Sequence, residues 1–168
     1  MTAVRILVTS SVALMAAAPG AAADTPAGVR ARLAHVALRP APLYPTRLPL
    51  RIQDSNAALS FSDGGFDVTW TRRGVESGQL LGYLTLGRGS RRELSEDLRI
   101  ARSRGFQPRR TRVGRFATWY LCGHICGYAW RAQSYTYSAF GIYYLQPGSE
   151  RADLRALIKR LAPLQPSA

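Results

Sequence analysis

The two cysteines, Cys122 and Cys126, are the residues whose type and spacing point most directly to chemistry, and they enclose the tripeptide Gly-His-Ile. As thiolates, the two sulfurs together with the imidazole of His124 could bind a soft metal such as Cu(I) or Zn(II). A catalytic thiol would instead need a lowered pKa and a base positioned beside it. In an oxidising compartment the same pair forms a disulfide, and we favour that interpretation.

Residues 1–23 have the pattern of a cleaved signal peptide. One positive charge, Arg5, precedes an apolar run, and the segment ends in the small side chains after which a signal peptidase cuts. The run is too short and too rich in Ala and Ser to span a membrane stably. We therefore expect cleavage between Ala23 and Asp24, a mature chain without a transmembrane segment, and a secreted, periplasmic or cell-envelope location.

Residues 111–145 read as three consecutive strands crowded with Trp and Tyr. A three-residue loop at 123–125 would place Cys122 opposite Cys126, and a second turn would follow at 133–134. The register then pairs Thr118 with Trp130, Trp119 with Ala129, Tyr120 with Tyr128 and Leu121 with Gly127. A two-residue type II′ loop is the competing register, and it would send the two cysteines to opposite faces of the sheet.

The two faces of these strands differ in composition. One face suits packing against helices and carries Trp119, Leu121, Phe140 and Ile142. The other is mostly aromatic and carries Tyr120, Cys122, Cys126, Tyr128, Trp130, Tyr135, Tyr137 and Tyr143. The aromatic face is either a second core layer under the N-terminal segments, an ordinary solvent-facing surface, or a platform on which sugars or bases stack.

The chain divides into a leader, one domain and a tail. Residues 24–49 form the leader, in which residues 29–38 could form a short helix. The four prolines of residues 39–49 fix the backbone and remove hydrogen-bond donors, so we expect an extended strap over the domain. Residues 50–163 form the domain, and residues 164–168 form the tail. Before the aromatic segment, short apolar runs between turn signals predict strands at residues 50–53, 58–62, 66–72 and 80–87.

Helical spacing of apolar residues occurs twice in the domain. Ser90 and Glu93 form a capping box for the first of these helices, and Gly105 supplies a left-handed end. Ser149 can cap the second helix, and Pro163 stops it. The fold class is therefore α+β, with one domain, a mainly antiparallel sheet of roughly five to seven strands, two helices packed on one face, and a disulfide-closed hairpin.

The chain is strongly basic, with a formal net charge of +13 at pH 7. Its acidic residues are unevenly placed, because residues 98–149 contain no Asp or Glu. The candidate binding residues are the arginines of this stretch that gather near its start: Arg99, Arg102, Arg109, Arg110, Arg112 and Arg115. Such a field attracts polyanions, although a solvated surface that keeps the protein soluble is the alternative explanation.

These features together favour a small exported protein that is not an enzyme and that binds an anionic polymer of the envelope or extracellular space. Glycopolymers, lipid headgroups and nucleic acid are candidate ligands, and we predict no cofactor and no catalytic residue, because no acid–base pair or nucleophile motif occurs at a telling spacing. A protein partner recognised by the tip between Cys122 and Cys126 is the first alternative. A metal site at Cys122, His124 and Cys126 is the second.

Overall fold

The computed structural model describes residues 24–36, 38–62, 65–74, 78–89 and 94–165. The expected signal peptide and the capping box of Ser90 and Glu93 lie outside the described residues. Within them the element order is α1 (Pro26–His35), β1 (Leu43–Pro45), η1 (Leu50–Ile52), β2 (Asn56–Ser62), β3 (Gly65–Arg73), β4 (Leu80–Arg88), α2 (Leu94–Ser103), β5 (Arg109–Val113), β6 (Phe116–Cys122), β7 (Cys126–Ala132), β8 (Tyr135–Tyr143), α3 (Glu150–Lys159) and β9 (Leu161–Pro163).

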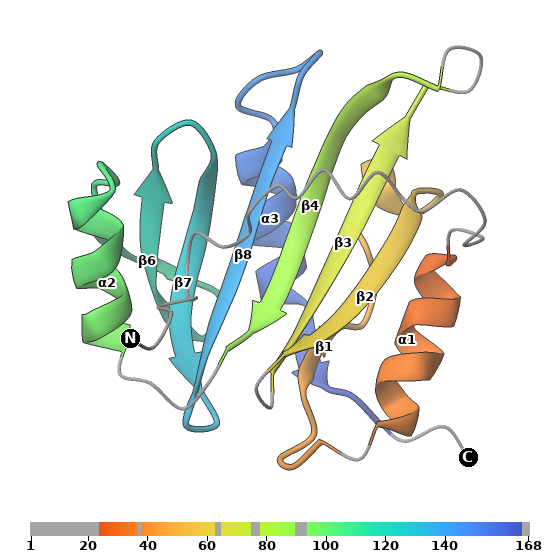
Figure 1. Ribbon diagram of the computed structural model, residues 1–168, viewed down its shortest axis with the longest axis horizontal. Helices are drawn as coiled ribbons and strands as arrows, with labels where there is room; N and C mark the ends of the chain where they lie inside the picture. The colour runs from red at the N-terminus through yellow and green to blue at the C-terminus, as the bar shows by residue number, and fades with distance from the viewer. Residues whose placement is uncertain (1–23, 37, 63–64, 75–77, 90–93, 166–168) are drawn as a thin grey trace.

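An antiparallel sheet of seven strands in the order β2-β3-β4-β8-β7-β6-β5 forms the centre of the molecule (Figure 1). A separate two-stranded sheet joins β1 to β9. The predicted α+β class and antiparallel sheet are confirmed. No helix in the part of the chain that the structure describes is long and apolar enough to cross a membrane.

The expectation that the domain's two helices share one face of the sheet is wrong. Leu98 and Ala101 of α2 pack with Leu121 and Phe140 on one face. The apolar stripe of α3 packs instead into the aromatic core on the opposite face, behind the sheet in the view of Figure 1. Helical periodicity predicts an apolar stripe but does not say which face of a distant sheet receives it. The second helix on the face of α3 is α1, from the leader.

The aromatic face is the main hydrophobic core of the protein. Tyr128, Trp130 and Tyr137 are fully buried. The proline-rich leader crosses this face, and the backbone N–H of Leu43 donates to the Tyr137 hydroxyl at 3.2 Å. The side chain of Tyr135, which is also buried, donates through its hydroxyl to the carbonyl of Arg39 at 3.3 Å. The stacking-platform interpretation is therefore wrong, because these rings are covered by the chain itself.

The predicted strand register of residues 118–141 is confirmed. Cys122 pairs with Cys126, and each neighbouring pair follows as expected up to Thr118 with Trp130. The second turn is also where the sequence placed it, with φ of 52° at Gln133 and 67° at Ser134. Positive φ at both central residues is the signature of a two-residue type I′ hairpin. The competing type II′ register at the first turn is excluded.

Three other local expectations are wrong, two because of packing with a distant segment and one because of a bond to a near neighbour. The predicted strand at residues 50–53 is the short helical turn η1, placed beside α3. The last helix ends at Lys159 rather than running to Pro163, because β9 pairs with β1. Ser149 does not cap that helix through its side chain, since its hydroxyl donates to the carbonyl of Gln146 at 2.8 Å.

Candidate functional site

The edge strand β5 carries three of the predicted arginines. Arg109, Arg110 and Arg112 are all exposed. Arg110 and Arg112 pair with residues of β6 that face α2, whereas Arg109 pairs with Tyr120 and lies on the α3 side. Because side chains alternate along a strand, the sheet separates Arg109 from the other two.

Helix α2 brings Arg99 and Arg102 to the same side of the sheet as Arg110 and Arg112. Both helix arginines are exposed, while Leu98 and Ala101 of the same helix face the sheet. Four predicted residues therefore lie on one side of the molecule, on two elements that are adjacent in the chain.

Arg115 is held at the turn between β5 and β6. Its Nη2 donates to the carbonyl of Leu161 at 2.9 Å, and its guanidinium carbon lies 5.0 Å from the centroid of the Phe116 ring. The turn also contacts the end of α3, because a Cβ added at Gly114 would lie 3.4 Å from Cγ of Lys159. Lys159, which sequence reasoning did not include, extends the positive charge around the sheet edge.

The hairpin tip is closed by the predicted disulfide between Cys122 and Cys126, whose Cα atoms are 4.2 Å apart. His124 is exposed at the tip, while Gly123 lies against the ring of Phe106. Neither sulfur is a thiolate, so neither can serve as the metal donor that the Cys-His-Cys alternative required. No group of three or more His, Cys, Asp or Glu side chains that could hold a metal occurs among the described residues.

A groove between η1 and α3 is a site that the sequence did not reveal. It has a volume of about 540 Å³ and is lined by Arg47, Arg51 and Arg160, by the carboxylate of Asp153, and by apolar side chains that include Leu50. Three arginines and one acidic residue therefore line this hollow. The groove lies on the α3 side of the sheet, so it is separate from the four arginines beside α2.

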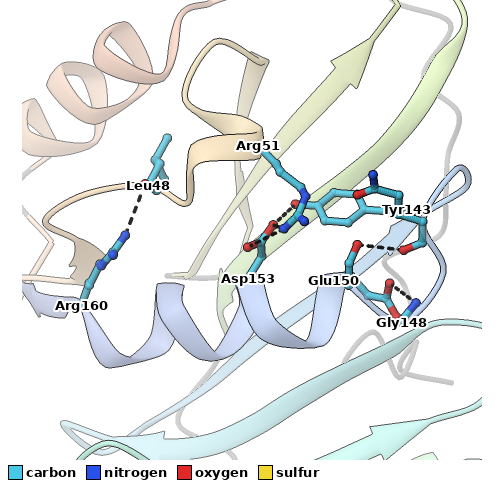
Figure 2. A network of polar contacts seen from close by, with 9 residues as sticks. Leu48, Arg51, Tyr143, Gly148, Glu150, Asp153 and Arg160 are labelled. Carbon is cyan, nitrogen blue, oxygen red and sulfur yellow. Dashed lines mark hydrogen bonds and ion pairs between the residues drawn. The ribbon is translucent and has the colours of Figure 1, made fainter.

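Asp153 is the centre of a polar network at one end of this groove (Figure 2). The hydroxyl of Tyr143 donates to Oδ2 of Asp153 at 3.0 Å, and Nη1 of Arg51 lies 3.3 Å from the same oxygen. Burial, together with the negative charge and hydrogen bond of Asp153, raises the pKa of Tyr143 well above its usual range. The carboxylate thus holds the Arg51 side chain in one position and keeps the tyrosine protonated.

The groove was missed because its residues come from segments that are far apart in sequence. Arg47 and Arg51 belong to a region read as a strap and a strand, and only the packing of η1 beside α3 brings them together. One sequence signal was available. Asp153 is four residues before Leu157, on the buried side of an amphipathic helix, and a buried acid on such a stripe needs a partner.

Family models, curated proteins and solved structures were compared with the chain, and none of them matches it. What the protein binds is therefore inferred from the geometry and charge of its side chains.

Proposed function

We propose that this is a small exported, non-enzymatic protein that binds an anionic polymer of the cell envelope or extracellular space. The contact surface, here called the arginine surface, comprises Arg99, Arg102, Arg110 and Arg112 on the α2 side of the sheet, with Arg109 on the opposite side of the edge strand and Arg115 at the β5–β6 turn. The observation that carries the proposal is the edge strand β5, on which three exposed arginines occur within four residues and no acidic residue follows before Glu150.

The spacing on β5 suits a ligand with repeated charges. Arg110 and Arg112 lie on the same face of the strand, two residues apart, so their Cα atoms are separated by about 7 Å. Guanidinium groups bind phosphate, sulfate or carboxylate oxygens through two parallel hydrogen bonds. A polymer that runs along the edge would meet the strand arginines in succession, and the α2 arginines would add attraction from the same side.

Charged residues on an edge strand also prevent two sheets from pairing edge to edge, and this is the competing explanation for β5. The double variant Arg110→Gln/Arg112→Gln distinguishes polymer binding from protection of the sheet edge. Polymer binding predicts elution from heparin and polyphosphate matrices at distinctly lower salt than the wild type, with an unchanged monomer. Edge protection alone predicts self-association of the variant with unchanged retention, and that result would overturn the proposal.

A matched control removes the same amount of charge elsewhere. Arg30→Gln/Arg73→Gln changes two exposed arginines on α1 and β3, and β3 is five positions from β5 in the sheet. If retention reflected only net charge, the control would elute as early as the β5 variant. The proposal predicts that the control stays close to the wild type.

Export through the N-terminal segment is the second part of the proposal. It is supported by the disulfide, which is typical of oxidising compartments. The expected cut keeps Asp24, whose carbonyl accepts a bond from the N–H of Ala57 at 2.7 Å, in the mature chain. The intact mass of the protein recovered outside the cytoplasm should correspond to a chain that starts at Asp24. A full-length mass in that fraction would contradict the expected cleavage.

Recognition of a protein partner by the hairpin tip is the second candidate function. The observation that favours it is the exposure of Gly123 and His124 on a loop closed by the disulfide. Under this alternative His124→Ala abolishes capture of the partner, whereas the Arg110→Gln/Arg112→Gln variant retains it.

A further inference from the structure

We propose that the groove between η1 and α3 is a binding site for an amphiphilic oxyanion, meaning a phosphate or carboxylate group that carries a short apolar substituent. The site is separate from the arginine surface and does not depend on polymer binding. Its binding residues are Arg47 and Arg160 for the oxyanion and Leu50 for the apolar group, with Arg51 as an anchored third cation.

The charge balance of the groove favours an anion. Arg47, Arg51 and Arg160 face it with three positive charges, and Asp153 supplies the one negative charge among the lining residues. That carboxylate is already engaged, since it accepts from the Tyr143 hydroxyl and pairs with Arg51. The groove therefore holds two positive charges in excess, which a phosphate dianion would neutralise fully and a carboxylate would neutralise by half.

Two of the three guanidinium groups are available to a ligand. Within the described part of the chain, Arg47 makes no hydrogen bond or ion pair, and Arg160 makes a single long bond of 3.4 Å to the carbonyl of Leu48. Arg51 is different, because its ion pair with Asp153 holds the side chain in place before any ligand arrives. An anchored cation beside one free and one weakly bonded cation lowers the ordering cost of binding.

Exposed apolar side chains beside these cations indicate the second half of the ligand. Leu50 lines the groove and is 76% exposed, and Leu145 is 69% exposed in a smaller hollow that shares Arg51 with the groove. A single exposed leucine is ordinary, but two that flank the same arginine form a mixed surface. A ligand with a charged head and a short apolar part would cover both kinds of group.

The size of the groove sets a limit on the ligand. A volume of about 540 Å³ lies within the range of sites that enclose small organic molecules, about 300 to 1,000 Å³. It accommodates one oxyanion with its substituent rather than a polymer segment. The chemistry is the same whether the oxyanion is a free metabolite or the headgroup of an anionic lipid, and the experiment has to distinguish these two sources.

The first arm uses calorimetric titration with phenyl phosphate, inorganic phosphate and benzyl alcohol. Phenyl phosphate should bind, inorganic phosphate about tenfold more weakly, and benzyl alcohol more weakly still, because each lacks one of the two contacts. The variant Arg47→Gln/Arg160→Gln should weaken phenyl phosphate binding by about ten- to a hundredfold. Both residues are exposed, and an unchanged thermal unfolding curve would confirm that the variant is folded.

The control for this arm is Arg110→Gln/Arg112→Gln, which should bind phenyl phosphate like the wild type. Equal affinity of the wild type and the Arg47→Gln/Arg160→Gln variant would overturn the proposal, and so would the absence of any binding. Loss of binding in the β5 control alone would move the small-anion site to the arginine surface and also overturn it. Conversely, failure of polymer retention would leave the groove proposal standing.

The second arm identifies the source of the oxyanion with vesicles of phosphatidylcholine alone or mixed with phosphatidylglycerol. Co-sedimentation with the mixed vesicles that is lost in Arg47→Gln/Arg160→Gln and kept in Arg110→Gln/Arg112→Gln identifies a lipid headgroup. Phenyl phosphate binding without such co-sedimentation identifies a free organic anion. Leu50→Ser tests the apolar contact, and it should weaken phenyl phosphate binding while leaving inorganic phosphate binding unchanged.

Discussion

Raising the pH above 10 should destabilise the protein through its buried tyrosines, and Tyr44 gives the clearest magnitude. Its ring is 4% exposed and lies 6.0 Å from the ring of Trp70. Burial raises the pKa of Tyr44 from 10.0 to about 12. Between these two values the unfolded chain loses the proton while the folded protein keeps it.

The sign of the effect follows from this difference in bound protons. The stabilising contribution is complete below pH 10 and is lost as the pH rises through the folded pKa. A shift from 10.0 to about 12 corresponds to about 2.7 kcal/mol of unfolding free energy. Burial raises the pKa values of Tyr137 and Tyr143 in the same direction, so the total alkaline loss should exceed the part due to Tyr44.

Urea unfolding at a series of pH values, followed by circular dichroism and tyrosinate absorbance, measures this loss. Tyr44→Phe keeps the ring and removes the titrating hydroxyl, so its stability at pH 7 should stay within about 1 kcal/mol of the wild type while its alkaline loss shrinks by about 2.7 kcal/mol. Tyr144→Phe is the control, because half of that side chain is already exposed in the folded protein. Parallel pH profiles for Tyr44→Phe and the wild type would refute the reasoning.

Three further perturbations test the packing around the two candidate sites. Gly127→Ala places a Cβ against the Phe140 ring and should lower the free energy of unfolding in urea by about 1 to 3 kcal/mol. The control Gly28→Ala in α1 should be neutral or stabilising. Equal effects of the two substitutions would argue against the close approach of β7 and β8. Tyr143→Phe removes a hydrogen bond to the Asp153 carboxylate and should lower stability by about 1.5 to 3 kcal/mol, and an unchanged melting temperature would mean that the network carries no stability. Reduction of the Cys122–Cys126 bond should cost about 2 kcal/mol because the loop is short, and thermal unfolding of Cys122→Ser/Cys126→Ser would check this without reductant. A complete loss of folding in that double variant would show that the bond does more than lock the tip.

The features that could be predicted from the sequence are those fixed by neighbouring residues. The register of β6 and β7 followed from two cysteines around a three-residue loop, and the next turn followed from polar residues between aromatic strands. The end of α2 is similar, because Gly105 adopts the predicted left-handed conformation with φ of 84°. Each of these choices depends on a few adjacent residues and on backbone sterics.

The features that could not be predicted depend on which distant segments meet. The stripe of α3 is clear in the sequence, yet its packing on the aromatic face is decided by the leader and by β1, which pairs with β9. The expected strand at residues 50–53 is likewise η1, whose Arg51 pairs with Asp153 of α3, a residue 102 positions away in the chain. The groove therefore follows from a long-range contact, whereas the arginine surface was visible because its residues lie close together in sequence.

The most direct test of anionic polymer binding is the salt dependence of the dissociation constant for fluorescently labelled polyphosphate. The wild type should lose affinity linearly on a log–log plot of binding constant against salt concentration. Arg110→Gln/Arg112→Gln should reduce the slope by about 1.5, since each lost contact removes about 0.7 to 0.9, while Arg30→Gln/Arg73→Gln should keep the wild-type slope. Identical slopes for the wild type and both variants, or no binding at low salt, would contradict the proposed function of the arginine surface.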